Sequence, residues 1–149
     1  MEQKLKKLTE MFPHIIKSYH SVSASLTKNM DVTLNQFKAI LYIDAVEKST
    51  LNELSSALNI AGSTTSEMVD RMVRRKYLNR SPDKENRRQV IITIGLKGKK
   101  TIVDFHQMAK EHFEKIFKIL SPKNRDKFYK AYEMLYEVTK EIDKSVEQR

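Results

Sequence analysis

The sequence predicts a mostly α-helical chain with one small β-hairpin, and three observations lead to this prediction. Apolar residues recur at steps of three and four along most of the 149 residues, which is the spacing of amphipathic helices. Residues 90–94 are instead all β-branched, as strands prefer. Residues 61–100 carry 11 basic and 4 acidic side chains, so seven of the nine net positive charges lie in this one segment.

The N-terminal residues 1–29 predict a helix with one apolar seam. The seam consists of Leu5, Leu8, Phe12, Ile15, Tyr19, Val22 and Leu26. Its alternating steps of three and four are a heptad pattern. Pro13 interrupts the pattern, and because proline removes a helical hydrogen bond, we expect a kink or a restart near residues 11–13. The seam fits a helix that packs on its own chain and one that packs across a dimer equally well.

Two short helices follow, and each begins with a capping signal. Thr33 precedes Gln36, and Thr50 precedes Glu53, at the spacing of a capping box. We therefore expect a helix over residues 33–46 that buries Phe37 and Leu41, and an amphipathic helix over residues 50–58. The best interpretation of both threonines is that they are helix caps rather than functional residues.

A third helix, near residues 62–75, completes a helix-turn-helix pattern. It carries Met68, Val69 and Met72 inward and is small and polar at its N-terminal end, the form in which a helix end enters the major groove. The strand at residues 90–94 then follows a charged loop tip at residues 83–88. A helix-turn-helix followed at once by a hairpin with a basic tip predicts a winged-helix lobe over residues 33–98.

The C-terminal part predicts two long helices. Their apolar positions are Ile102, Phe105, Ala109, His112, Ile116 and Ile119 in the first, and Phe128, Tyr132, Leu135, Val138, Ile142 and Val146 in the second. Ser121-Pro122 separates them as an N-cap followed by the first helical position. Because a small lobe cannot cover these stripes, we expect one domain over residues 1–149 whose segments 1–29 and 100–149 are dimerisation helices of a symmetric homodimer.

Composition narrows the function. A basic patch on one module indicates a polyanionic partner, and its coincidence with the helix-turn-helix favours double-stranded DNA over simple surface solubility. The chain has no cysteine, which excludes disulfides, thiol redox sensing and Cys-containing zinc sites. No stretch approaches the roughly 20 apolar residues that cross a bilayer, and no signal peptide is evident. We expect a cytoplasmic protein that binds no membrane.

Five segments carry a resemblance to a known family. They are residues 31–37 (DVTLNQF), 51–58 (LNELSSAL), 65–72 (TSEMVDRM), 83–88 (DKENRR) and 94–98 (IGLKG). In this order and spacing the chain resembles MarR-type winged-helix transcriptional regulators over nearly its full length. The resemblance implies a homodimer, joined through its first and last helices, that binds pseudo-palindromic operator DNA. It also implies frequent derepression by small aromatic or anionic ligands held between the dimer helices and the DNA-binding lobe.

The chain departs from the family pattern at four positions. Ala61 stands where a capping serine is common, so Ser63 is the candidate substitute cap. Lys76 replaces the glycine that usually follows the recognition helix, and Gly95 replaces a threonine. Glu67 occupies a position that is often basic; a carboxylate there repels phosphate but accepts a hydrogen bond from cytosine N4.

The predicted DNA-binding residues lie on the recognition helix and the wing. They are Ser63, Thr64, Ser66 and Glu67 for base edges and flanking phosphates, Arg71, Arg74 and Arg75 further along the helix, and Arg87 and Arg88 at the wing tip. Arg74 and Arg75 suit phosphates, whereas Arg71 suits either DNA or a supporting pair with Asp70 or Asp83. The wing arginines suit the narrow minor groove, where negative potential concentrates, and Asp83 is expected to orient Arg87.

Three other functions are weighed. The four histidines lie in no nucleophile, phosphate-loop or zinc-hydrolase motif, so we expect no enzyme and no cofactor. A metal-responsive regulator would use His106 and His112, but their spacing of six places them on different sides of a helix. An architectural winged helix without sequence preference would carry the same charge.

An effector site is the least specific prediction. The side chains that could line a ligand cleft are Tyr19, His20, Phe37, Tyr42 and Met108, although core packing is the better interpretation of each. The sequence identifies neither the effector nor the operator, and it does not separate a repressor from an activator.

Overall fold

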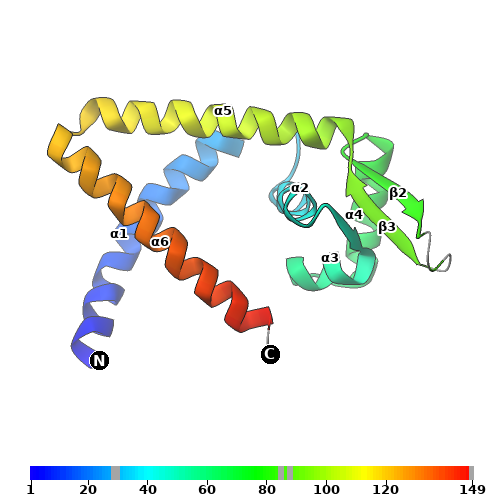
Figure 1. Cartoon of the computed structure of the whole chain (residues 1–149), viewed down its shortest axis with the longest axis horizontal. Coiled ribbons are helices and arrows are strands. Elements are labelled where there is room, and N and C mark those ends of the chain that lie inside the picture. Colours follow the sequence, from blue (N-terminus) through cyan, green and yellow to red (C-terminus); the bar gives the residue numbers. More distant parts are fainter. Residues whose placement is uncertain (28–30, 84–85, 87–88, 148–149) are drawn as a thin grey trace. The chain divides into compact units, whose positions relative to one another are not determined.

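The computed structural model describes residues 1–27, 31–83, 86 and 89–147, with the side chains of residues 18–27 and 143–147 left out. Within these residues the chain forms six helices and a three-stranded antiparallel sheet (Figure 1), which confirms the predicted fold class. The chain divides into two compact units, Met1–Ala109 and Lys110–Arg149. Each unit is described by itself.

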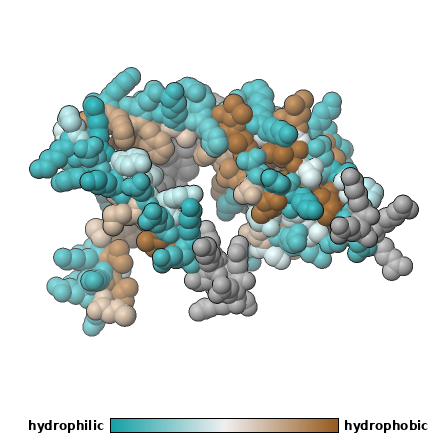
Figure 2. All heavy atoms as spheres, viewed as in Figure 1, coloured by the Kyte–Doolittle hydropathy of each residue, from teal (hydrophilic) through white to brown (hydrophobic). Residues whose placement is uncertain are grey.

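The first helix, α1 (Glu2–Thr27), runs unbroken through Pro13. The predicted restart near residues 11–13 is therefore wrong, because one missing hydrogen bond does not interrupt the turns on either side of the proline. Its apolar seam is exposed: Leu5, Leu8 and Phe12 keep 56%, 58% and 62% of their surface accessible. Figure 2 shows apolar residues, in brown and tan, along the stretch of α1 at the lower left.

The helices α2 (Leu34–Val46) and α3 (Leu51–Leu58) begin at the predicted capping boxes. The Thr33 hydroxyl accepts from the Gln36 amide at 3.3 Å while the Thr33 amide donates to the Gln36 side chain at 2.9 Å. Thr50 and Glu53 repeat this reciprocal arrangement. Both threonines are caps, as predicted. Leu41, in contrast, stays 37% exposed, so its predicted burial under the helix-turn-helix is wrong.

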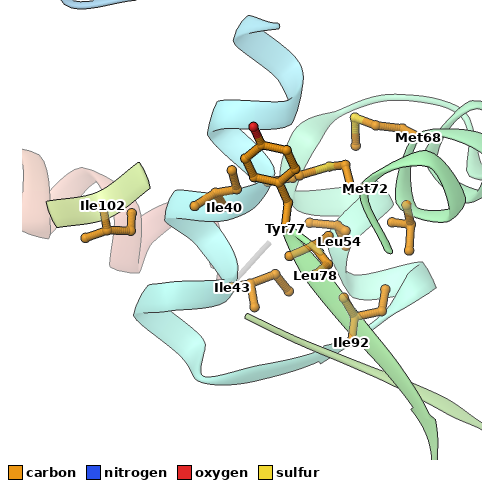
Figure 3. Close-up of a cluster of buried hydrophobic side chains, with 11 residues drawn as sticks. Ile40, Ile43, Leu54, Met68, Met72, Tyr77, Leu78, Ile92 and Ile102 are labelled. Atoms are coloured by element: carbon orange, nitrogen blue, oxygen red, sulfur yellow. The ribbon is translucent and has the colours of Figure 1, made fainter. Parts of the chain in front are cut away.

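The core of the first unit forms where α2, α3, α4 (Gly62–Arg74) and the sheet meet. Figure 3 shows its labelled side chains converging from these elements. The buried apolar residues are Ala39, Ile40, Ile43, Leu54, Met68, Val69, Met72, Tyr77, Leu78, Ile92 and Ile102. The predicted inward residues of α4 all belong to this core, which fixes the recognition helix rigidly on the lobe.

The sheet contains the predicted wing and one strand that the sequence did not reveal. The strands β2 (Leu78–Pro82) and β3 (Val90–Ile94) form the hairpin, and β1 (Lys48–Thr50) pairs with the other edge of β3. Ser49 lies opposite Ile92, and Arg80 lies opposite Ile92 from the β2 side. A three-residue strand is too short to show an alternating pattern, and only the tertiary pairing with β3 defines it.

The helix α5 (Leu96–Ile119) is tied to the end of α4 by backbone contacts. The Gly95 amide donates to the Tyr77 carbonyl at 2.8 Å, and the Lys97 amide donates to the Lys76 carbonyl at 3.0 Å. A side chain at Gly98 would clash with the Tyr77 carbonyl oxygen. Lys76 itself adopts a left-handed backbone with φ of 64°, which explains why this is a position that favours glycine.

The second unit is a helical hairpin made of the C-terminal part of α5 and the helix α6 (Pro122–Glu147). Arg125 closes the turn, because its Nε donates to the carbonyls of Phe117 and Leu120 at 2.6 and 3.0 Å. Aromatic rings join the two helices, with Phe113 5.4 Å from Tyr132 and Phe117 6.0 Å from Phe128. The predicted start of the last helix at Ser121-Pro122 is confirmed.

Candidate nucleic-acid interface

The helix α4 has one face in the core and one face in solvent. Thr65, Met68, Val69 and Met72 are buried, whereas Ser63, Thr64, Glu67, Arg71 and Arg74 are exposed and Ser66 is half-buried. At about 100° per residue, Ser63, Glu67 and Arg74 lie nearly opposite the middle of the buried face. These three of the side chains predicted to contact bases and phosphates therefore project away from the lobe together.

The N-terminus of α4 has no side-chain cap. Ala61 is the N-cap residue, and none of its amides is satisfied by a side chain there. The predicted replacement cap, Ser63, is wrong because Ser63 lies inside the first turn of the helix rather than before it. Instead, Thr65 turns inward and its hydroxyl donates to the Ala61 carbonyl at 3.0 Å.

Two ion pairs on α4 differ from the predicted pairing. Arg71 Nη1 lies 3.9 Å from Glu67 Oε2, one turn earlier on the same helix. Asp70 Oδ1 instead accepts from Arg80 Nη1 at 2.7 Å, which links the recognition helix to strand β2 of the wing. The expected Arg71 pair with Asp70 or Asp83 is therefore corrected. Arg80 sets the wing beside α4 and was missed, since an exposed arginine in a strand carries no distinctive signal.

Arg75 is engaged within the lobe. Its guanidinium forms an ion pair with the Asp31 carboxylate and donates to the Asp31 carbonyl at 2.9 Å. The hydrogen bond that it donates to the Asp31 carboxylate raises the pKa of this guanidinium further above its ordinary range. Its carbon Cζ also lies 5.2 Å from the centre of the Tyr77 ring, a cation–π distance. Arg75 thus joins the C-terminus of α4 to the segment before α2, and its predicted phosphate contact stays a prediction.

The wing carries the remaining predicted contacts. The Asp83 amide donates to the Gln89 carbonyl at 2.8 Å, which holds the base of the tip. Asn79 Nδ2 donates to the Ile94 carbonyl at 3.1 Å and braces the other end of the hairpin. Arg87 and Arg88 lie outside the described residues, so their groove contacts, and the expected orientation of Arg87 by Asp83, stay predictions.

Comparison with known families decides what this lobe is. The sequence model of the MarR family matches residues 32–90, from the start of the α2 cap to the first residue of β3. Residues 32–90 therefore match the MarR family. The matched family and the fold are those of transcriptional regulators with a winged-helix DNA-binding lobe, and not those of enzymes.

Individual MarR-like proteins are distant in sequence. YfiV of Bacillus subtilis, an HTH-type transcriptional regulator, is 19% identical over a stretch that covers 71% of this chain and 66% of YfiV, slightly under two thirds. A MarR family protein from Bacillus stearothermophilus is 22% identical with a TM-score of 0.77, over 94% of this chain and 98% of that one. A MepR mutant from S. aureus, solved bound to an oligodeoxyribonucleotide, is 22% identical with a TM-score of 0.66, over 90% and 97%.

The winged-helix lobe also borders a pocket of about 540 Å³ beside α5. Its lining residues are Asp31, Tyr77, Lys97, Lys100, Thr101, Asp104, Gln107 and Met108. Lys97 Nζ lies 5.8 Å from the centre of the Tyr77 ring, and Lys100 Nζ donates to both Asp104 oxygens at 2.6 and 2.9 Å. An aromatic ring and a lysine therefore face one cavity at the junction of α4 and α5.

Of the five predicted ligand residues, one lines that pocket. Met108 lines it. Phe37 is buried and packs against Phe105 with ring centres 5.0 Å apart, and Tyr42 packs against the core. The side chains of Tyr19 and His20 lie outside the description. The sequence did not reveal this pocket, because Tyr77, Lys97 and Asp31 are far apart in sequence and each has an ordinary role in its own segment.

The described residues contain neither a metal-binding cluster nor a membrane-spanning helix. Among them, no group of three or more His, Asp or Glu side chains is arranged to hold a metal ion. None of the helices in the described part of the chain is long and apolar enough to cross a membrane.

Proposed function

We propose that the protein is a cytoplasmic repressor that binds pseudo-palindromic operator DNA as a homodimer and is released by a small aromatic or anionic ligand. The observation that carries this proposal is the solvent face of α4, where Ser63, Glu67 and Arg74 project together beside the wing. We propose a repressor rather than an activator because a repressor acts by occupying its operator and needs no further contact with the transcription machinery.

The DNA-binding mode follows from the two faces of α4. The N-terminal half enters the major groove with Ser63, Thr64, Ser66 and Glu67 at base edges. Arg74, at the far end of the exposed face, lies where the groove wall and its phosphates are expected. The pair of Asp70 with Arg80 at 2.7 Å links the wing to this helix, which supports the proposed contact of Arg87 and Arg88 with the adjacent minor groove.

The homodimer is supported by the apolar side chains that the long helices expose. Phe12 in α1 and Leu135 and Ile142 in α6 keep 62%, 52% and 55% of their surface accessible. Leaving such stripes in water is unfavourable by about 25 cal/mol per Å² of apolar surface. We propose that residues 1–29 and 100–149 of two chains bury them together within one domain of residues 1–149, and that the winged-helix lobe spans residues 33–98.

The ligand response is supported by the pocket at the start of α5. A homodimer must hold its two recognition helices about 34 Å apart to reach successive major grooves. The pocket lies against Tyr77 and Lys97, which belong to the junction that joins α4 to α5. An aromatic anion that stacks on Tyr77 and pairs with Lys97 would stabilise one lobe position over another. It shifts the equilibrium only by its differential affinity for the two.

Capture of genomic fragments tests the proposal. The purified protein is mixed with fragmented DNA from its own source, and the retained fragments are sequenced. We expect enrichment of a few fragments with a two-fold symmetric motif, and a specific affinity that exceeds the affinity for random DNA by 10³-fold or more. Uniform retention of all fragments would instead identify an architectural protein.

The ligand is tested on the captured operator. Salicylate-like aromatic acids are titrated against the preformed complex at constant ionic strength. We expect DNA release at high concentration, and reciprocal weakening of ligand binding by DNA. Operator binding that no aromatic anion affects even at millimolar concentration would leave the repressor proposal intact and remove the ligand from it.

A further inference from the structure

The central feature of the recognition face is a carboxylate. At about 100° per residue, Glu67 lies roughly 150° from the middle of the buried face of α4. Its side chain is 74% exposed. Any orientation of α4 that brings its polar residues to the floor of the major groove brings this carboxylate there too. Between two phosphate backbones, a carboxylate that finds no hydrogen-bond donor is repelled, so the position must either be matched by a base or weaken binding.

Arg71 accompanies Glu67 on this face. Its Nη1 lies 3.9 Å from Glu67 Oε2, and its side chain is 54% exposed. An exposed pair of this kind contributes only about 0–1 kcal/mol, so neither group is committed to the other in the unbound protein. The two therefore form an acceptor and a donor, side by side, that are able to turn toward DNA without breaking any buried contact.

One base pair matches this arrangement. In the major groove a G·C pair presents guanine N7 and O6 as acceptors and cytosine N4 as a donor, in that order. A guanidinium donates to both guanine atoms, and a carboxylate accepts from cytosine N4. The A·T pair places its donor between two acceptors and adds a methyl group, so the guanidinium cannot make both hydrogen bonds.

We infer that Glu67 and Arg71 act as one unit that recognises a single G·C base pair in each half-site. The inference rests on the proposed sequence-specific binding and identifies the base pair that the recognition helix selects. Glu67 accepts from cytosine and Arg71 donates to guanine, and their positions one turn apart on α4 place both groups beside the same base pair. Because the pair is neutral overall, it selects sequence without adding attraction to phosphates.

The test is an in vitro selection of binding sites from random duplexes with the full-length protein and its Glu67→Gln variant. Glutamine adds a donor, and its amide forms two hydrogen bonds with adenine N6 and N7. At one position per half-site, we expect the ratio of affinities for cytosine and adenine to shift toward adenine by roughly 5- to 140-fold. A wild-type selection that enriches no motif would refute the proposed function itself, before this inference is tested.

A second variant asks whether the two residues act on the same base pair. Arg71→Lys keeps the charge but loses the planar fork that contacts guanine O6 and N7 together. We expect it to relax the preference for guanine at the same position that Glu67→Gln changes, with no change in salt dependence. Changes at two different positions, or an unchanged motif in either variant, would overturn the inference.

A matched control separates recognition from net charge. Lys110 and Glu114 form the same kind of pair at 4.0 Å, one turn apart on α5. Glu114→Gln therefore removes one negative charge from an exposed pair on another helix, in which the order of the two charges is reversed. We expect its selected motif to equal that of the wild type, and a shift like that of Glu67→Gln would show that charge alone is responsible.

Discussion

The winged-helix lobe and the long helices differ in how much of their apolar surface is buried. In the lobe, Ile40, Ile43, Leu54 and Val69 have no accessible surface. In the described part of α6, no side chain is buried, and Tyr136 stays 61% exposed. The lobe helix α4 and the long helix α6 are both amphipathic, so the difference lies in what surrounds each helix. The core of the lobe is filled by side chains of its own chain, and we propose that the long helices bury their apolar stripes against a second chain.

Truncation of the long helices should have the largest effect. Removing residues 1–26 deletes the exposed seam of α1, which we propose to be half of a dimer contact. The remaining chain should run as a monomer or aggregate in light scattering, and operator affinity should fall steeply because two lobes no longer bind together. A well-behaved dimer after this truncation would contradict the proposed role of α1.

A change at the junction of α4 and α5 should damage the lobe instead. In Gly98→Ala, the new methyl group clashes with the Tyr77 carbonyl oxygen, and this neighbour is backbone. We expect a loss of about 1–3 kcal/mol in the free energy of unfolding, measured by chemical denaturation. Gly62→Ala is the matched control, since nothing lies within 4 Å of its added methyl group. An equal loss in both variants would exclude the close approach as the cause.

Substitutions of the neighbouring Arg74 and Arg75 should have different effects, because we propose that the first contacts DNA and the second supports the lobe. Arg74→Ala removes an exposed charge from the DNA-facing side and should reduce the salt slope of operator binding by about one unit. Arg75→Ala removes the contact with Asp31 and should lower thermal stability more than it changes that slope. Affinity at several salt concentrations and a melting curve for each variant decide between these outcomes, and identical behaviour would contradict the assignment.

The left-handed residue at the end of α4 should allow a small stabilisation. Lys76 has φ of 64°, a conformation that costs a residue with a Cβ roughly 1–2 kcal/mol. Lys76→Gly removes that cost but adds flexibility to the unfolded chain, so we expect a net rise of about 0.5–1 kcal/mol in denaturant unfolding. Asn59→Gly is the control: Asn59 is also left-handed, with φ of 52°, but asparagine tolerates this region and the gain should be smaller.

The smallest expected effect is a pH dependence of one capping box. Hydrogen bonds from the Thr50 amide and hydroxyl hold the pKa of Glu53 below its ordinary value of 4.5. The lowered pKa means that this contribution to stability is present above pH 4.5 and is lost as the pH falls through the lower folded value. In Glu53→Gln, thermal melts from pH 6 downward should show a smaller loss in this window. The α2 box already contains the neutral Gln36, so Gln36→Ala should leave the pH dependence unchanged.

Much of this architecture could be predicted from the sequence because its signals are local. Thr33 and Thr50 marked two helix starts, and the β-branched run at residues 90–94 marked the wing. What the sequence did not reveal depends on partners far along the chain. The strand at residues 48–50 exists only through its pairing with β3. The pairing of Arg75 with Asp31, 44 residues earlier, likewise depends on the tertiary fold.

The stoichiometry of the operator complex tests the account most directly. Each chain has a mass of 17.5 kDa, so sedimentation of the protein with one captured operator duplex distinguishes one, two or many bound chains. We predict that two chains bind per duplex, and that this ratio does not rise when excess protein is added. A single bound chain would contradict the homodimer, and continuous loading along the duplex would contradict sequence-specific repression.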